Sequence, residues 1–531
     1  MQTSELSKVK SDLIAEIEKR VEDRVLEPSN AELLSKLIAQ ADNDNEAISI
    51  AALGTTYKRT GLHFDKRLER LTHDIRYFRK NETLSFHMDD NKPTHKLIIG
   101  DNYEALQNLL VQYTGAIDVI YIDPPYGKDS MGEFAQTNYQ NAITRDNLLS
   151  MLYPRLQLAK QLLSDSGVIF CSIDDKNQAY VKCLFDEVFG ERNFVANIIW
   201  QKIHSIKNDA KYLSDCHEYI LVYARNIDLL EINLLPRTEE MNARYTNPDN
   251  DPRGPWQSGD LVANGERKNG HFIVKSPTTG CEFDVPQGKH WVYSEENMHE
   301  LIRTNSLYFG IKGDAFPRKK RFLSEVQSGR TPGTIWLSEE VGHNQSATKE
   351  VIAIFGERGK FDFPKPTQLI QQLLQISSNP ESVVLDFFAG SGTTAQAVLE
   401  LNRSEKVEGD LITAGLPEGN RTFILCQMNE KTDITPNGIA YDVTAKRLKR
   451  IMTGECYDGT KDFEWIKKNK PYGGNLDVYE IDKVADFEYT EGKSPFDVID
   501  ETLYGLPRFA TLQEKIDWVC THFSNARKQL D

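Results

Sequence analysis

The chain has 531 residues, of which 39% are hydrophobic and 27% charged, and its formal net charge is −16. It has no apolar run long enough to cross a bilayer and no signal-peptide pattern at its start, so we expect a cytoplasmic protein without a membrane anchor. The seven cysteines form no C-x-x-C pair, which argues against a zinc site and a disulfide framework, and no metal is expected.

The acidic balance of 79 Asp+Glu against 63 Lys+Arg is unfavourable for a protein that binds polyanions over its whole surface. Residues 301–330 are an exception, with seven basic residues against two acidic ones. Any face that binds nucleic acid is therefore expected to be local.

Residues 1–90 form the first predicted region, which is helical. Apolar residues recur there at helical spacing before Pro28 interrupts the pattern. These positions are Leu6, Val9, Leu13, Ile17 and Val21.

Residues 91–225 are predicted to be the first part of an α/β core. Short β-rich runs such as AIDVIYI and GVIFCSI alternate there with helical stretches, including a helix over 147–163, as in a parallel sheet covered by helices. The same alternation returns in residues 346–455, which we interpret as the second part of the core. Residues 226–345 lie between these parts and are rich in Pro, Gly and Asn, so they are predicted to be an inserted domain. Residues 456–531 show no clear periodicity, and we interpret them as a C-terminal region for dimerisation or partner docking.

The first chemical motif is Asp123-Pro124-Pro125-Tyr126, directly after the apolar run IDVIYI. Two prolines fix φ and remove two amide donors, which leaves a stiff turn whose carbonyls are free to accept hydrogen bonds. The Asp123 carboxylate and the Pro124 carbonyl would make a planar amine more nucleophilic, while Tyr126 would stack on its ring. The alternative is an ordinary proline turn that closes a strand.

The second motif spans residues 383–397, where an apolar strand ends at Asp386 and a glycine-rich turn opens a helix. Glycines at such a turn let a nucleoside approach the backbone, so an adenosine-type ligand is expected. A phosphate-binding P-loop is disfavoured because Thr393-Thr394 follows Gly392. Simple close packing is the alternative. The candidate contacts of this turn are Asp386, Phe388, Ala389, Gly390, Gly392 and Thr393.

Glu430 ends the next β-rich run, RTFILCQMNE. An acidic residue at the end of the second strand of a dinucleotide fold accepts the ribose hydroxyls, and Glu430 is predicted to do the same. The spacing is longer than usual because a polar loop, residues 402–420, intervenes.

Together these motifs resemble the β class of amino-methyltransferases, in which D-P-P-Y precedes F-x-G-x-G and a target-recognition region lies between them. Within that class the chain looks like the modification subunit of type III restriction-modification systems. Residues 50–455 carry the likeness. Its main segments are TTYKRTGLHFDKRLER, LIIGDNYEALQNLL, RLQLAKQLLSDSGVIFCSIDD, FGERNFVANIIWQK, HEYILVYARN, DPRGPW and the run from Phe363 to Pro366.

The resemblance implies a Rossmann-like sheet with circularly permuted motifs that binds S-adenosylmethionine and methylates the N6 amine of adenine in duplex DNA after base flipping. It also implies a homodimer and a separate restriction subunit as partner. Three further cofactor contacts are implied: Asp101 near the cofactor adenine, and Lys365 with Thr367 beside its methionine part. Asp101 could instead cap the following helix, and Lys365 could be a solvated loop residue.

Basic and aromatic residues of the insert are candidates for phosphate or base contact, against the alternative of a solvated charged surface. They are Arg253, Trp256, Lys268, Arg318, Lys319, Lys320 and Arg321. Residues 127–146 are polar and are interpreted either as a mobile lid or as a plain surface loop.

Three alternatives to adenine methylation remain. Cytosine N4 methylation uses the same chemistry, although Ser in place of Asp123 would favour it. A catalytically silent DNA-specificity subunit would not need both intact motifs. RNA or protein-glutamine methyltransferases usually carry the glycine motif first.

Overall fold

The computed structural model describes residues 7–22, 28–53, 76–126, 144–205, 211–326, 329–358, 361–403 and 419–483. None of the helices in these ranges is long and apolar enough to span a membrane. The chain divides into two units, Met1–Asp65 and Lys66–Asp531.

The described residues of the first unit form three helices, in agreement with the predicted helical region: α1 (Lys8–Glu22), α2 (Pro28–Gln40) and α3 (Asp44–Leu53). They pack on a small core in which Ile17 and Ile38 are fully or almost fully buried. Leu6 lies outside the described residues.

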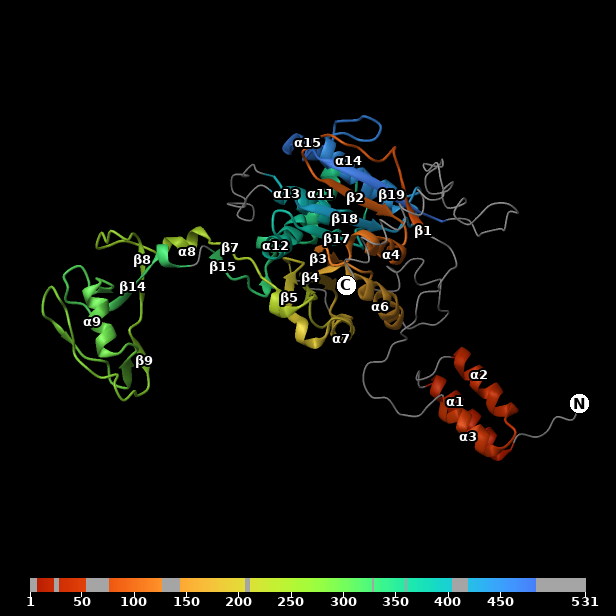
Figure 1. Cartoon of the computed structure of the whole chain (residues 1–531), viewed down its shortest axis with the longest axis horizontal. Helices are drawn as coiled ribbons and strands as arrows, with labels where there is room; N and C mark the ends of the chain where they lie inside the picture. The colour runs from red at the N-terminus through yellow and green to blue at the C-terminus, as the bar shows by residue number, and fades with distance from the viewer. Residues whose placement is uncertain are drawn as a thin grey trace, which may run out of the picture. The chain divides into compact units, whose positions relative to one another are not determined.

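The second unit is built on a ten-stranded sheet with the order β1-β19-β2-β18-β17-β3-β4-β6-β5-β16 (Figure 1). Neighbouring strands from β19 to β4 are parallel, whereas β1 pairs antiparallel with β19 and β6 lies antiparallel to both β4 and β5. This confirms the predicted α/β fold. The strands are β1 (Arg76–Lys80), β2 (Thr94–Ile99), β3 (Ile117–Ile122), β4 (Leu163–Ile173), β5 (Phe194–Gln201), β6 (His217–Ala224), β16 (Ile335–Trp336), β17 (Val383–Asp386), β18 (Thr422–Gln427) and β19 (Asn475–Lys483).

Helices cover both faces of this sheet. In the described residues, α6 (Thr144–Leu162) lies between β3 and β4 and α13 (Thr393–Leu401) lies between β17 and β18, and the two connections lead in opposite directions along the strand order. Because such crossovers are right-handed, the two helices lie on opposite faces. The helices of the core are α4 (Asn102–Tyr113), α6 (Thr144–Leu162), α7 (Gln178–Phe189), α10 (Ser338–Val341), α11 (Asn344–Phe355), α12 (Thr367–Ser377), α13 (Thr393–Leu401), α14 (Lys446–Thr453) and α15 (Glu464–Lys468).

The adjacent strands β17 and β3 form the switch point of the sheet. Val384 pairs with Val119 and Leu385 with Ile120, and the chain leaves the two strands in opposite directions. A crevice therefore opens beyond their carboxyl ends, which is where open α/β sheets bind ligands.

The predictions for the two end regions of the chain need correction. Residues 76–80 form β1, although residues 1–90 were predicted to be helical, and β19 belongs to the main sheet, although its region was assigned no fold. Leu476 and Val478 of β19 are fully buried, so this strand has the alternation of a core strand. Residues 484–531 lie outside the described residues.

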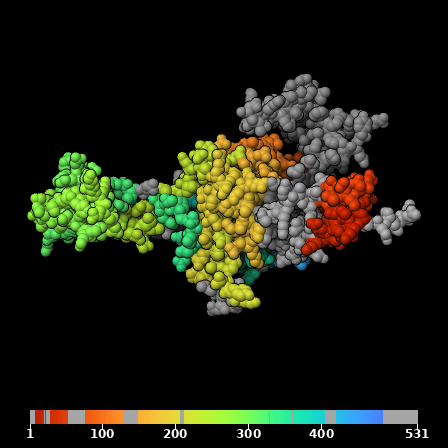
Figure 2. Space-filling model, turned by 90° about the horizontal axis from the view of Figure 1, so that it is seen from below, coloured from red at the N-terminus to blue at the C-terminus, as the bar shows by residue number. Residues whose placement is uncertain are grey.

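The predicted insert leaves the sheet after β6 and returns to it in β16, so its predicted C-terminal boundary includes a strand of the main sheet. Its own core contains Leu261, Trp291 and Met298, and its residues gather in a body of their own (green in Figure 2). The insert contains β7 (Leu235–Pro236), α8 (Glu239–Ala243), β8 (Trp256–Gly259), β9 (Val262–Asn264), β10 (Val274–Lys275), β11 (Glu282–Phe283), β12 (Lys289–Trp291), α9 (Glu295–Arg303), β13 (Leu307–Tyr308), β14 (Arg318–Phe322) and β15 (Gly329–Arg330).

Candidate active site

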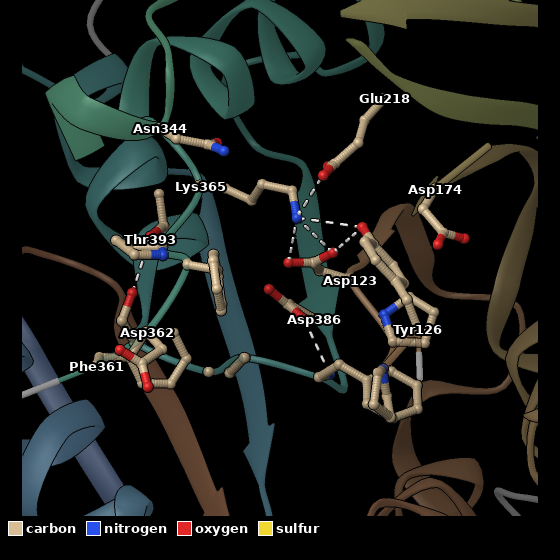
Figure 3. Close-up of a pocket in the computed structure, with 18 of the residues that line it drawn as sticks. Asp123, Tyr126, Asp174, Glu218, Asn344, Phe361, Asp362, Lys365, Asp386 and Thr393 are labelled. Atoms are coloured by element: carbon tan, nitrogen blue, oxygen red, sulfur yellow. Dashed lines mark hydrogen bonds and ion pairs between the residues drawn. The ribbon is translucent and has the colours of Figure 1, made fainter. Parts of the chain in front are cut away.

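A cleft of about 710 Å³ opens at the carboxyl ends of β3 and β17. The Asp-Pro-Pro-Tyr turn and the glycine-rich turn both line it, although the insert separates them in the sequence (Figure 3). The two sequence motifs therefore belong to a single site.

The Asp-Pro-Pro-Tyr turn is fixed by its own side chains and by the turn after β4. The Tyr126 hydroxyl donates to the Asp123 carboxylate at 2.5 Å. The Asn177 side chain donates to the Tyr126 carbonyl at 2.9 Å and to the Asp174 carboxylate at 2.8 Å. Burial raises the pKa of Tyr126, and the Asp123 charge raises it further, so the phenol stays protonated as a donor.

Lys365 comes from the segment before α12 and meets Asp123. Its Nζ lies 2.7 Å from both carboxylate oxygens and 3.2 Å from the Tyr126 hydroxyl. Burial lowers the pKa of Lys365, but Asp123 and Glu218 outweigh it and the pKa is raised, so the side chain remains an ammonium. The alternative of a solvated loop residue is therefore wrong, since the side chain is 9% exposed.

Glu218 is a member of this site that the sequence analysis missed. It lies on β6, its Oε2 is 3.5 Å from Lys365 Nζ, and its Oε1 is 3.5 Å from Lys202 Nζ. The strand pattern HEYILVYA gave no sign of this role, because alternation identifies the buried face of a strand but not a partner from a distant segment.

Asp386 holds the first part of the glycine-rich turn. One carboxylate oxygen accepts from the Phe388 amide at 3.0 Å and the other from the Thr394 hydroxyl at 2.5 Å. Burial raises the pKa of Asp386 to about 7 against the opposing effect of these two hydrogen bonds. Asp386 lines the cleft, and its own hydrogen bonds shape the turn.

Gly390 and Gly392 need the conformations that glycine allows, with φ of +51° and +79°. A Cβ at Gly390 would lie 2.9 Å from the Phe361 ring. The Gly390 amide donates to the Gln427 side chain at 2.6 Å. Position 390 therefore has no room for a side chain beyond that of glycine. Gly392 is instead the N-cap residue of α13 and does not line the cleft.

Thr367 was predicted to contact a cofactor, but it belongs to a hydrogen-bond network behind the glycine-rich turn. Its side chain is buried and donates to Glu350 at 2.6 Å, and it is not one of the residues that line the cleft. Glu350 also pairs with Arg447 at 3.4 Å, and Arg447 donates to the Thr393 hydroxyl at 3.2 Å. This buried network joins α11, α12 and α14 to the start of α13.

Asp101 caps the helix that follows it, which was the alternative to a cofactor contact. Its carboxylate accepts from the Tyr103 amide at 2.7 Å as the N-cap of α4 and pairs with Arg155 at 3.1 Å. After β2, Asn102 lines the cleft and Asp101 does not. Glu430, three residues after β18, also lines the cleft. The other predicted site residues in the lining are Pro124, Pro125, Phe388, Ala389 and Thr393.

In the insert, two residues predicted to contact DNA are buried instead. Lys320 Nζ lies 2.5 Å from Asp249 and 2.8 Å from Asp251, and its side chain is 0% exposed. Trp256 is 4% exposed and donates to Asp249 at 2.8 Å. Alternate residues of a strand face opposite sides, so Lys320 points inward on β14 and holds the insert together.

The remaining basic candidates are accessible to different degrees. Arg253 pairs with Asp251 at 2.9 Å, and Lys319 is half-buried and donates to the Tyr293 hydroxyl at 2.8 Å. Three candidates are exposed, namely Lys268, Arg318 and Arg321. Residues 127–143 of the predicted lid lie outside the described residues.

The doubly wound sheet brings the Asp-Pro-Pro-Tyr turn and the glycine-rich turn into one cleft at its switch point, with the Asp-Pro-Pro-Tyr turn first along the chain. This arrangement is that of an α/β enzyme with its site at the carboxyl ends of the strands. The chain belongs to the DNA methylase family, which it matches over residues 117–433. Residues 10–118 match a second family, described only as an uncharacterised conserved protein.

Several curated relatives are similar over most of the chain. The StyLTI Mod subunit of a type III restriction-modification enzyme from Salmonella typhimurium is 34% identical over 64% of this chain and 53% of its own length. The EcoPI Mod subunit from Escherichia phage P1 is 29% identical over 68% of this chain and 63% of its own length. The type II methyltransferase M.KpnI from Klebsiella pneumoniae is 28% identical over 72% of this chain and 94% of its own length. The chain thus spans between half and two thirds of the length of these two Mod subunits.

Proposed function

We propose that this chain is a site-specific DNA methyltransferase that moves a methyl group from S-adenosylmethionine to the N6 amine of adenine in duplex DNA. We further propose that it acts in the cytoplasm as the modification subunit of a type III restriction-modification system. The observation that carries this proposal is that the amine-accepting turn and the glycine-rich turn open into the same cleft. Methyl transfer needs the amine and the methyl donor side by side.

The cleft fits S-adenosylmethionine by its shape and charge. The Phe361 ring packs directly against the bare backbone of Gly390, and Phe361 and Phe388 both line the cleft, so they offer aromatic surfaces to a flat nucleoside. Carboxylates that line the cleft, including Asp362 and Glu430, suit a ligand with a positively charged sulfur. Phe388, Gly390 and Glu430 would hold the cofactor, which supplies an activated methyl group.

The residues of the chain act on the amine. The Asp123 carboxylate and the Pro124 carbonyl would accept its two N–H groups and direct the nitrogen lone pair toward the methyl carbon. On gaining the methyl group the amine nitrogen would become positive and would then release one N–H proton to solvent, and the demethylated thioether would remain as the cofactor product. A fixed carboxylate beside the nitrogen stabilises this charge.

The target base must leave the duplex to reach Asp123, because the acceptor turn lies inside a cleft. Tyr126, which lines the cleft, offers its ring as a stacking surface for the flipped base. The exposed Lys268, Arg318 and Arg321 of the insert are the proposed phosphate or base contacts. The names of the Mod-subunit relatives support a separate restriction subunit as partner, and we also propose a homodimer.

Methyl transfer from tritium-labelled S-adenosylmethionine to unmethylated bacterial DNA, followed by nucleoside analysis, tests this function. The label is expected in N6-methyladenine. Label in N4-methylcytosine would assign the reaction to the other amine, and unlabelled DNA would contradict the proposal.

A further inference from the structure

The Lys365 ammonium is bound to the Asp123 carboxylate, which is the proposed acceptor for the target amine. Its Nζ lies 2.7 Å from each carboxylate oxygen, and the Tyr126 hydroxyl takes a further position on one of them. A carboxylate has about four lone-pair positions and these contacts take three, so the amine can reach only the remaining position, on an oxygen that Lys365 also holds. The ammonium therefore competes with the incoming substrate.

The ammonium is also unfavourable for the chemistry if it stays. Positive charge develops on the amine nitrogen during methylation, and a second cation in contact with the same carboxylate opposes it. Burial lowers the pKa of Lys365, but Asp123 and Glu218 more than compensate, so loss of the Lys365 proton near neutral pH does not solve the conflict. The ammonium must move to another anion.

Glu218 is placed to be that anion (Figure 3). Its Oε2 is buried, accepts no hydrogen bond from the residues that the structure describes, and lies 3.5 Å from Lys365 Nζ. A shift of the ammonium by roughly 1 Å would form a full hydrogen bond there. A lysine makes such a shift by rotating its flexible stem, without backbone movement.

We propose that Glu218 is the receiving carboxylate for Lys365, which holds Asp123 in the empty cleft and moves to Glu218 when the target amine takes its place. This inference rests on the proposed methyltransferase function. Glu218 is then a positioning residue, since it acts on the target amine only through Lys365.

The test compares single-turnover methyl transfer to unmethylated bacterial DNA by the full chain and by Glu218→Gln, which keeps the shape of the side chain and removes its charge. We expect a rate at least tenfold lower, with an S-adenosylmethionine Kd within about twofold of the wild type by calorimetry. Glu218→Asp, which keeps the charge, should recover part of the rate. A merely structural role would lower cofactor affinity as well.

Asp186→Asn is the matched control for removing a half-buried carboxylate next to β6. Asp186 pairs with Lys182 and accepts from Tyr223 of the same strand, and it does not line the cleft. Its substitution should leave the transfer rate within twofold. A rate for Glu218→Gln that equals that of this control would overturn the proposal.

The Lys365→Met variant tests whether Glu218 acts through Lys365. Glu218→Gln should slow transfer in the wild-type background and have no further effect in the Lys365→Met background, because the cation to be received is gone. A penalty that persists in the double variant, or Lys365→Met without measurable transfer, would contradict the displacement. Inactive wild-type protein would instead indicate failure of the proposed function itself.

Discussion

Lys365 Nζ contacts both carboxylate oxygens of Asp123 at 2.7 Å, although 242 positions separate the two residues. Asp123 directly follows β3 in the first part of the core, and Lys365 precedes α12 in the second part, beyond the insert. The pair thus ties the two halves of the catalytic core together at the point where the proposed chemistry occurs.

Asp123→Ala should reduce methyl transfer by about a thousandfold, because the nitrogen loses its charged acceptor. Cofactor affinity should change little, since the proposed cofactor contacts lie on the other side of the switch point. Single-turnover transfer and calorimetry measure the two effects separately. Retained turnover would remove Asp123 from the mechanism.

Gly390→Val should weaken S-adenosylmethionine binding more than tenfold. The new side chain would meet the Phe361 ring and force a branched residue into a φ of +51°. Gly115→Val is the control for backbone strain alone, because Gly115 has a φ of +65° and nothing within 4 Å of a Cβ. Calorimetric affinities that are equal for both variants would exclude the proposed role of the turn.

Asp386 should make stability depend on pH. Its pKa is raised by burial from 3.8 to about 7, so the folded state binds the proton more tightly than the unfolded state. The stabilisation is complete below about pH 4 and is lost as pH rises through 7, a change of roughly 4 kcal/mol in the free energy of unfolding.

Urea unfolding of the wild type and Asp386→Asn between pH 4 and 8 isolates this contribution. The stability of the wild type relative to the variant should fall as pH rises across that window. A difference that stays constant, or grows with pH, would show that Asp386 is ionised in the folded protein throughout.

Lys320 and Arg321 are neighbours on β14 and should respond to substitution in opposite ways. Lys320→Met leaves Asp249 and Asp251 without their buried cation and should destabilise the insert by about 3 kcal/mol or more. Arg321→Met should leave stability unchanged and lower the salt dependence of DNA binding by about one counterion. Thermal unfolding and binding titrations at several salt concentrations check both. Equal stability of the two variants would contradict the structural role of Lys320.

The sequence was sufficient to predict the parts of the site that depend on local chemistry. The Asp123 turn and the Gly390 turn each follow a buried strand, and both line the cleft as the motifs indicated. The alternation of β-rich runs with helical stretches likewise predicted the parallel core. These features depend on residues close together in the chain.

Features that depend on distant pairing were missed or misassigned. Glu218 belongs to the site because it pairs with Lys365, and β19 belongs to the sheet because it pairs with β1 and β2. A local sequence pattern specifies neither pairing. Lys320 was grouped with its charged neighbours because a run of basic letters does not show that one of them points inward to Asp251. Thr367 supports the turn through Glu350 in the same indirect way.

The central claim is that a flipped adenine is methylated at Asp123, and methylome sequencing tests it most directly. A methylation-deficient bacterial host would express either the full chain or the Asp123→Ala variant. We expect N6-methyladenine at one recurring sequence with the wild type and none with the variant. A genome without modified adenine in the presence of soluble wild-type protein, or equal methylation by both proteins, would contradict the account.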